Sequence, residues 1–235
     1  MPVSSPRAAF WRGLTAALPF LIVLGPFGLL FGVVGTEAGL DVGQVMGFTV
    51  LVIAGASQFT ALQLMHDNAP TLIVIASALA VNLRMAMYSA SFVPHLGAAP
   101  IWQRALIAYM TVDQTYALAN GEYEAAPKQS TAEKVAFFFG TAAPTIPVWI
   151  GASALGIVVG EAIPPALGLD FAVPITFIAL IAPALRTLAH VAAALTSIVM
   201  AIALSFLPWN LWLLAAGLAA MIVGAEVERR MEARR

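Results

Sequence analysis

The chain has 235 residues, of which 61% are hydrophobic and 10% are charged, and its mean hydropathy is +0.91. A soluble domain carries about a quarter charged residues, so this composition excludes an ordinary soluble protein. The net charge of −1 implies no nucleic-acid partner. The absence of cysteine excludes disulfides, thiolate catalysis and cysteine-ligated metals.

The apolar residues fall in long blocks, and residues 42–65, 135–160 and 187–225 contain no Asp, Glu, Lys or Arg. Because about 20 apolar residues cross a bilayer, the sequence predicts an all-α polytopic transmembrane bundle that forms one membrane domain over residues 1–235. Eight spans are predicted, at about 13–36, 42–65, 70–94, 101–121, 134–160, 168–185, 187–206 and 209–228. Only Arg186 and Thr187 separate the sixth span from the seventh, so seven spans are an alternative.

The Lys and Arg residues predict the orientation, because they gather in cytoplasmic loops. With a cytoplasmic N-terminus, nine of the eleven lie on the cytoplasmic side: Arg7, Arg12, Lys128, Lys134, Arg186, Arg229, Arg230, Arg234 and Arg235. Arg104 falls at the outer end of span four, against this rule, and Arg84 lies inside a span. Both termini are therefore predicted to be cytoplasmic. The short basic segment before the first span is expected to be retained.

Residues 31–41 (FGVVGTEAGLD) resemble residues 155–170 (LGIVVGEAIPPALGLD). Many transporters contain structural repeats, although glycine-rich helices also produce such similarities by chance. The sequence thus raises an internal repeat as a possibility.

The first span contains Gly25, Pro26, Phe27 and Gly28 at its centre. Proline removes a backbone donor and clashes with the preceding turn, so we predict a discontinuous helix that lines a solute site here. The alternatives are a simple kink, or close helix packing through small residues. Span two places Gly55, Ser57 and Gln58 at similar depth. Pro144 and Pro147 predict a similar break in span five, and Pro174 and Pro183 a weaker one in span six.

Arg84 lies about ten residues from the end of span three, too deep to reach the interface. A charge at the bilayer centre costs about 2.5–3.5 kcal/mol, so Arg84 should face protein, water or an anion. Tyr88 shares its helix face, whereas Asn82 does so only if the helix is irregular. A polar stripe of Tyr109, Asp113, Tyr116 and Asn120, with Gln114 beside it, is expected on span four.

A short loop joins spans three and four, so they are expected to be antiparallel neighbours in which Arg84 pairs with Asp113. This pair has two interpretations that overlap. It fixes the helix register as a structural ion pair, or it meets a charged solute.

The segments LGPFGLLFG, AGASQF, NLRMAMYSASF, DQTYAL and LGLDFAVPITFIALI resemble the AzlC family, the large subunits of bacterial branched-chain amino acid exporters. The resemblance covers about residues 13–223. It implies multi-pass insertion in the bacterial inner membrane and export of leucine, isoleucine and valine, with methionine as a further candidate. It also implies transport driven by the proton gradient, a small AzlD-like partner subunit and no cofactor.

A branched-chain amino acid needs a partner for its carboxylate, a partner for its ammonium group and an apolar surface. Arg84 or a half-helix N-terminus would take the carboxylate, and Asp113 or carbonyls freed near Pro26 would take the ammonium group. The predicted substrate-binding residues are Gly25, Pro26, Phe27, Gly28, Gly55, Ser57, Gln58, Asn82, Arg84, Tyr88, Asp113 and Gln114.

Other classes of function stay open at this point. The chain could be a transporter or channel subunit for another small solute, or a membrane scaffold subunit that transports nothing. An intramembrane enzyme is disfavoured, because the sequence offers a single intramembrane Asp and no partnered nucleophile. With three His and no Cys, we expect no metal site.

Overall fold

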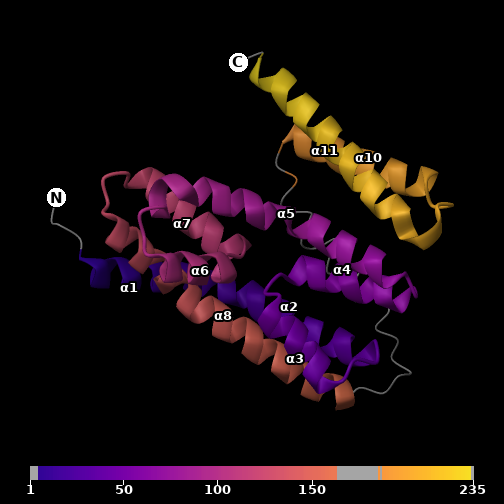
Figure 1. The fold of residues 1–235 in the computed structure, drawn as a ribbon, viewed down its shortest axis with the longest axis horizontal. Coiled ribbons are helices and arrows are strands. Elements are labelled where there is room, and N and C mark those ends of the chain that lie inside the picture. Colours follow the sequence, from indigo (N-terminus) through magenta and orange to yellow (C-terminus); the bar gives the residue numbers. More distant parts are fainter. Residues whose placement is uncertain (1–4, 163–184, 186, 234–235) are drawn as a thin grey trace. The chain divides into compact units, whose positions relative to one another are not determined.

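The computed structural model describes residues 5–162, 185 and 187–233, and every regular element within these ranges is a helix (Figure 1). This confirms the predicted helical fold class. Apart from residue 185, the predicted span 168–185, with Pro174 and Pro183, lies outside the described residues. In chain order the elements are α1 (Pro6–Ala17), η1 (Leu18–Phe20), α2 (Leu21–Glu37), α3 (Val42–Leu51), α4 (Gly55–His66), α5 (Thr71–Leu96), α6 (Ile101–Met110), α7 (Asp113–Ala125), α8 (Thr131–Ala162), α10 (Leu188–Ala203), η5 (Pro208–Asn210) and α11 (Leu211–Glu232).

The chain divides into two compact units, which are described separately. The first unit comprises Met1–Gln58 and Asn82–Leu167, and the second comprises Phe59–Val81 and Gly168–Arg235. The boundaries fall within α4 and α5, so each of these helices contributes to both units.

Four helical segments in the described ranges are long and apolar enough to cross a membrane: Pro6–Glu37, Thr71–Leu96, Thr131–Gly160 and Leu211–Glu232. The count of eight spans is therefore not confirmed. The predicted bundle contains discontinuous helices, and the segments 42–65 and 101–121 are each interrupted near the centre, at residues 52–54 and 111–112. The ten-residue helices α3 and α6 are about 15 Å long, about half the thickness of the hydrocarbon core.

The predicted break at Gly25–Pro26 is also wrong, because α2 continues through Pro26. Pro26 lies on the exposed side of the helix, and no atom lies within 4 Å of a Cβ built at Gly25. The proline ring therefore has room, and membrane helices tolerate a proline by local adjustment. The irregular turn in this span is η1, at Pro19. Helix α8 likewise continues through Pro144 and Pro147.

Helix α1 packs against the first part of α8 through glycines on both sides. A Cβ added at Gly13 would overlap the carbonyl oxygen of Phe137, and one at Gly140 would overlap the carbonyl oxygen of Phe10. The two contacts are reciprocal, since Phe10 and Gly13 are separated by the same spacing as Phe137 and Gly140. Small residues of this kind let membrane helices approach closely.

Helix α2 repeats this arrangement with the last part of α8 (Figure 1). A Cβ at Gly32 would lie 2.8 Å from the Cα of Gly156, and one at Gly156 would lie 3.0 Å from the Cα of Gly32. Gly32 and Gly156 also occupy equivalent places in the two similar sequence segments. The alternative of close helix packing through small residues is thus confirmed at Gly32.

These reciprocal contacts support the internal repeat over the residues that the structure describes. The segment α1–α2 and the helix α8 are parallel and are related by an approximate two-fold axis. The first copy of the repeat is α1–α2, and the second is α8. The segment from Gly13 to Gly32 in the first copy is three residues longer than the segment from Gly140 to Gly156 in the second. The turn η1 is three residues long and lies in this interval. It therefore accounts for the difference between the two copies.

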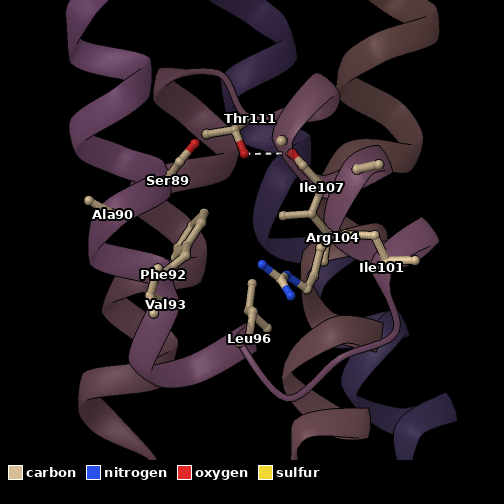
Figure 2. Close-up of a pocket in the computed structure, with 12 residues that line it drawn as sticks. Ser89, Ala90, Phe92, Val93, Leu96, Ile101, Arg104, Ile107 and Thr111 are labelled. Atoms are coloured by element: carbon tan, nitrogen blue, oxygen red, sulfur yellow. Dashed lines mark hydrogen bonds between the residues drawn. The ribbon is translucent and has the colours of Figure 1, made fainter.

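Helices α6 and α7 form a hairpin rather than one span. Contacts between α5 and α7 advance together along both helices, from the pair Arg84–Asp113 to the rings of His95 and Tyr123. Helix α7 is therefore parallel to α5, whereas α6 packs back along α5 after the turn at 97–100 (Figure 2). The expectation that span four is wholly antiparallel to span three is wrong for the half that carries Asp113.

The start of α6 and the end of α7 lie together at the same end of the first unit. We call this end of the unit the basic end. It comprises the starts of α1, α6 and α8 and the ends of α5 and α7. The hydroxyl of Tyr123 donates to the carbonyl of Lys134 at 2.9 Å, the Lys134 ammonium lies 3.1 Å from Nδ1 of His95, and Arg12 pairs with Glu122 at 2.8 Å. All Lys and Arg residues of the first unit except Arg84 belong to this end. The placement of Arg104 at the opposite end is thus wrong.

The hairpin can be tested by labelling, because the chain has no natural cysteine. We expect cysteines introduced at Ala98 and Lys128 to react with a membrane-impermeant maleimide from the same side of the membrane. Both residues are exposed and flank the hairpin. A cysteine at exposed Ala38, beyond α2, should react only from the other side. Labelling of positions 98 and 38 from the same side would instead restore the continuous fourth span.

In the second unit, α10 and α11 pack against each other, with Gly224 of α11 close to Ala193 of α10. Asn210 adopts a left-handed conformation at the start of α11, and its amide donates to Asp67 at 3.3 Å. Near the C-terminus, Glu226 pairs with exposed Arg229 and Arg230.

Candidate functional site

The predicted pair of Arg84 and Asp113 is confirmed. Nη1 of Arg84 lies 2.9 Å from Oδ2 of Asp113. Arg84 is in the middle of α5, about 18 Å of helix before Leu96. Asp113 is the first residue of α7, where the positive end of the helix dipole favours a carboxylate. The pair therefore lies at the tip of the hairpin.

The ion pair is open to its surroundings. The side chains of Arg84 and Asp113 are 31% and 43% exposed. An ion pair that holds two helices together is stabilising only when its geometry is good and its remaining polar atoms are hydrogen-bonded. Here Nε of Arg84 is buried without a hydrogen-bond partner in the described part of the chain. The site thus keeps an unused donor atom within an accessible charge pair.

The rings of Tyr88 and Tyr116 form an aromatic surface beside the Arg84–Asp113 ion pair. The Tyr88 hydroxyl donates to Oδ1 of Asp113 at 3.0 Å. The rings of Tyr88 and Tyr116 stack with centroids 3.9 Å apart, and Ser91 donates to the hydroxyl of Tyr116 at 3.2 Å. The site therefore combines a cation, an anion and an apolar aromatic surface. Tyr116 was expected in the polar stripe but not as a binding residue.

Hydrogen bonds of two threonine side chains stabilise the helix break before Asp113. The hydroxyl of Thr115 accepts from the amide of Val112 at 2.9 Å and lies 3.1 Å from the carbonyl of Met110. Thr111 donates to the carbonyl of Ile107 at 2.6 Å. Backbone groups freed at membrane depth need such partners. Thr111 and Thr115 thus satisfy the break locally, and the sequence analysis did not identify either.

Hydrogen bonds from side chains outside residues 52–54 stabilise the break between α3 and α4. The amide of Gln58 donates to the carbonyl of Phe48 at 2.7 Å, although a straight helix would place these residues about 15 Å apart. The hydroxyl of Tyr109, at the end of α6, donates to the carbonyl of Val50. The interruption of α3–α4 therefore contacts the end of α6. The predicted stripe that joined Tyr109 to Asp113 is wrong, since they lie on different helices.

Gln58 gives a direct test of this bend. We expect Gln58→Met to destabilise the protein by about 1–2 kcal/mol, because the Phe48 carbonyl loses its donor inside the protein. Gln63→Met is the matched control, since Gln63 lies on the same helix, is exposed and bonds only Asp67 among the described residues. Melting temperatures in detergent measure both. Equal melting of the two variants would contradict a role for Gln58 at the bend.

A second group of predicted residues gathers around Trp149 of α8. A Cβ at Gly55 would lie 2.6 Å from the ring of Phe27 and 3.0 Å from the ring of Trp149. Gly28 faces the same tryptophan, and the rings of Phe27 and Trp149 are 5.8 Å apart. Glycine at position 55 thus lets the start of α4 lie against these rings.

The remaining predicted residues have different positions. Ser57 is buried and donates to the carbonyl of Ala54 at 3.2 Å. Gln114 is half-buried beside Asp113 on α7, whereas Pro26 is exposed. The structure therefore brings Arg84, Tyr88 and Asp113 together. Asn82 lies on a different face, because α5 is a regular helix there. The structure groups Phe27, Gly28 and Gly55 separately.

Comparison with known proteins matches residues 19–163 to the family described as AzlC protein. A membrane protein of Archaeoglobus fulgidus is 26% identical over 214 residues, which cover 86% of this chain and 88% of that protein. A membrane protein of Helicobacter pylori is 28% identical over 155 residues, which cover 66% of this chain. This chain spans only 64% of the Helicobacter protein, and both relatives are named uncharacterized membrane proteins.

No solved structure matches the chain. The matched family segment covers more than half of the residues, and it includes the glycine contacts of α2 with α8 and the whole Arg84–Asp113 site. The family is one of membrane transport proteins. The chain belongs to the AzlC family.

Proposed function

We propose that this chain is the large subunit of a secondary transporter that exports branched-chain amino acids across the bacterial inner membrane. The observation that carries the proposal is the open ion pair of Arg84 and Asp113 at the tip of a half-helix hairpin. Interrupted helices at membrane depth are typical of solute sites in secondary transporters.

The chemistry of the site matches both ends of a zwitterion. The carboxylate of an amino acid would bind the guanidinium of Arg84 through charge-assisted hydrogen bonds. Its ammonium group would bind Asp113, whose second oxygen already accepts from Tyr88. The solute would thus replace the internal ion pair by two external ones, which limits the cost of removing each charge from water.

The apolar side chain would lie on the stacked rings of Tyr88 and Tyr116. An aliphatic side chain buries its surface there without needing a further polar partner. This arrangement favours leucine, isoleucine, valine and methionine over amino acids with charged side chains.

The proton gradient would drive export in this proposal. The small AzlD-like subunit belongs to the same proposal as the second membrane component of the exporter.

The test is counterflow of labelled leucine in proteoliposomes that contain this chain with its small partner. We expect accumulation of label when unlabelled leucine is loaded inside, and loss of net export when a proton uncoupler is added. Lysine in place of leucine is the control solute. Absence of leucine counterflow in vesicles with both subunits would contradict the proposal, and the scaffold interpretation would then be preferred.

A further inference from the structure

A groove of about 430 Å³ lies between α5 and α6 in the first unit (Figure 2). Its walls are mostly apolar, with Phe92 and Leu96 from α5 and Ile107 from α6. Several lining residues are exposed, among them Val93 and Ile101, so the groove opens to the outer surface of these helices. It does not include Arg84 or Asp113, and the proposed solute site does not use it.

Among the described residues, Arg104 is the one charged residue that lines this groove. Figure 2 shows its guanidinium between α5 and α6, directed towards Leu96. The Arg104 side chain is exposed, and no carboxylate of the described residues forms an ion pair with it. An exposed guanidinium beside an apolar groove can pair with an anion from the surroundings.

The Arg104 side of the groove belongs to the basic end, and Lys and Arg residues gather at the membrane surface. Arg104 is one turn into α6, which starts at Ile101, and exposed Trp102 lies beside that start. Tryptophan is enriched at the level of lipid headgroups. Basic pockets between membrane helices bind anionic headgroups. A phosphate at this level would reach Arg104, while an acyl chain would fill the apolar groove beyond it.

We propose that this groove binds an anionic phospholipid, whose phosphate pairs with Arg104 and whose acyl chain lies between α5 and α6. Bidentate pairing of a guanidinium with a phosphate supplies the selectivity for anionic lipid. The groove adjoins the solute site through Phe92, whose ring lies 5.3 Å from that of Tyr116. The bound lipid would therefore support the α5–α6 packing on which the hairpin depends.

Native mass spectrometry of the purified full-length protein tests this site, with phosphatidylglycerol and phosphatidylcholine as probes. We expect Arg104→Gln to weaken retention of phosphatidylglycerol about tenfold, as loss of one charge-assisted contact predicts. Arg7→Gln removes the same charge at the same end of the unit, from an exposed residue outside the groove, and should leave retention within about twofold. Phosphatidylcholine should bind weakly to all three proteins.

A second variant within the groove keeps the Arg104 charge and fills the apolar space. Ala108 is exposed and lines the groove, so Ala108→Phe should also lower retention of phosphatidylglycerol while Arg104 is intact. Equal retention by wild type and both groove variants would overturn the proposal. Displacement of the lipid by excess leucine would overturn it as well, because the groove would then hold the solute.

Discussion

Arg84→Ala should reduce leucine counterflow by about a hundredfold or more, while the protein still inserts and assembles. The variant removes the cation that pairs with Asp113 at 2.9 Å, and with it the proposed partner of the solute carboxylate. In the proposed solute-bound state, where the solute displaces water from this open pair, loss of one charged partner costs about 2–5 kcal/mol. Asp113→Asn should have a similar effect on flux, since an amide offers the ammonium group no charge. Counterflow in proteoliposomes measures both, with insertion checked by gel filtration.

A charge swap separates the functional role from the structural one. In the double variant Arg84→Asp with Asp113→Arg, the ion pair can form again, so a purely structural pair would regain flux. A solute-binding pair would not, because the carboxylate and the ammonium group would each meet the wrong charge. We therefore expect the swapped protein to assemble without transporting leucine.

The pair Arg12–Glu122 at the basic end is the matched control for this swap. Its atoms are 2.8 Å apart and its side chains are 42% and 23% exposed, values close to those of Arg84–Asp113. It joins α1 to α7 far from the hairpin tip and has no proposed role in binding. Swapping Arg12 and Glu122 should retain most of the flux. Recovery of flux in the swapped Arg84–Asp113 protein would reject the proposed solute site.

The sequence was sufficient to predict the helical class and the central ion pair. Both follow from the high cost of exposing polar groups to lipid. Uninterrupted apolar blocks have to be helices, and a charge as deep as Arg84 needs a partner. The nearest opposite charge along the chain at similar depth was Asp113. This reasoning does not depend on whether α7 is parallel or antiparallel to α5.

The positions of the helix breaks could not be predicted in the same way. Proline at position 26 suggested a break, yet the exposed side of α2 has room for its ring. The actual interruption after α3 contains neither proline nor glycine at residues 52–54. It is stabilised by Tyr109, 59 residues away in the sequence. Such a break depends on a donor from another helix, which no local pattern shows.

The hairpin had a local signal that was not used. The segment Thr111–Thr115 places Asp113 next to threonines, and both residue types favour helix N-termini over helix interiors. In a soluble protein this pattern would predict the start of a helix. Within an apolar block it was interpreted as polar residues on one continuous span, and the reversal of the chain was missed.

Gly156→Leu should destabilise the first unit by about 3 kcal/mol or more, the second large effect expected here. Any Cβ at this position would overlap the carbonyl oxygen of Leu29 and approach the Cα of Gly32 at 3.0 Å. These are backbone atoms of α2, so the two helices would have to separate. Gly151→Ala is the matched control on the same helix, because a Cβ there has no atom within 4 Å. It should be neutral or stabilise α8 by up to about 1 kcal/mol.

The approximate two-fold axis leads to a further prediction for Gly32 and Gly156. Because Gly32 and Gly156 occupy equivalent places, Gly32→Leu should cost about as much as Gly156→Leu in melting temperature. Once either leucine has separated α2 from α8, the second has less contact left to break. The double variant should therefore lose clearly less stability than the sum of the single variants, as expected for residues in direct contact. Additive losses would mean that the two glycines do not face each other across the axis.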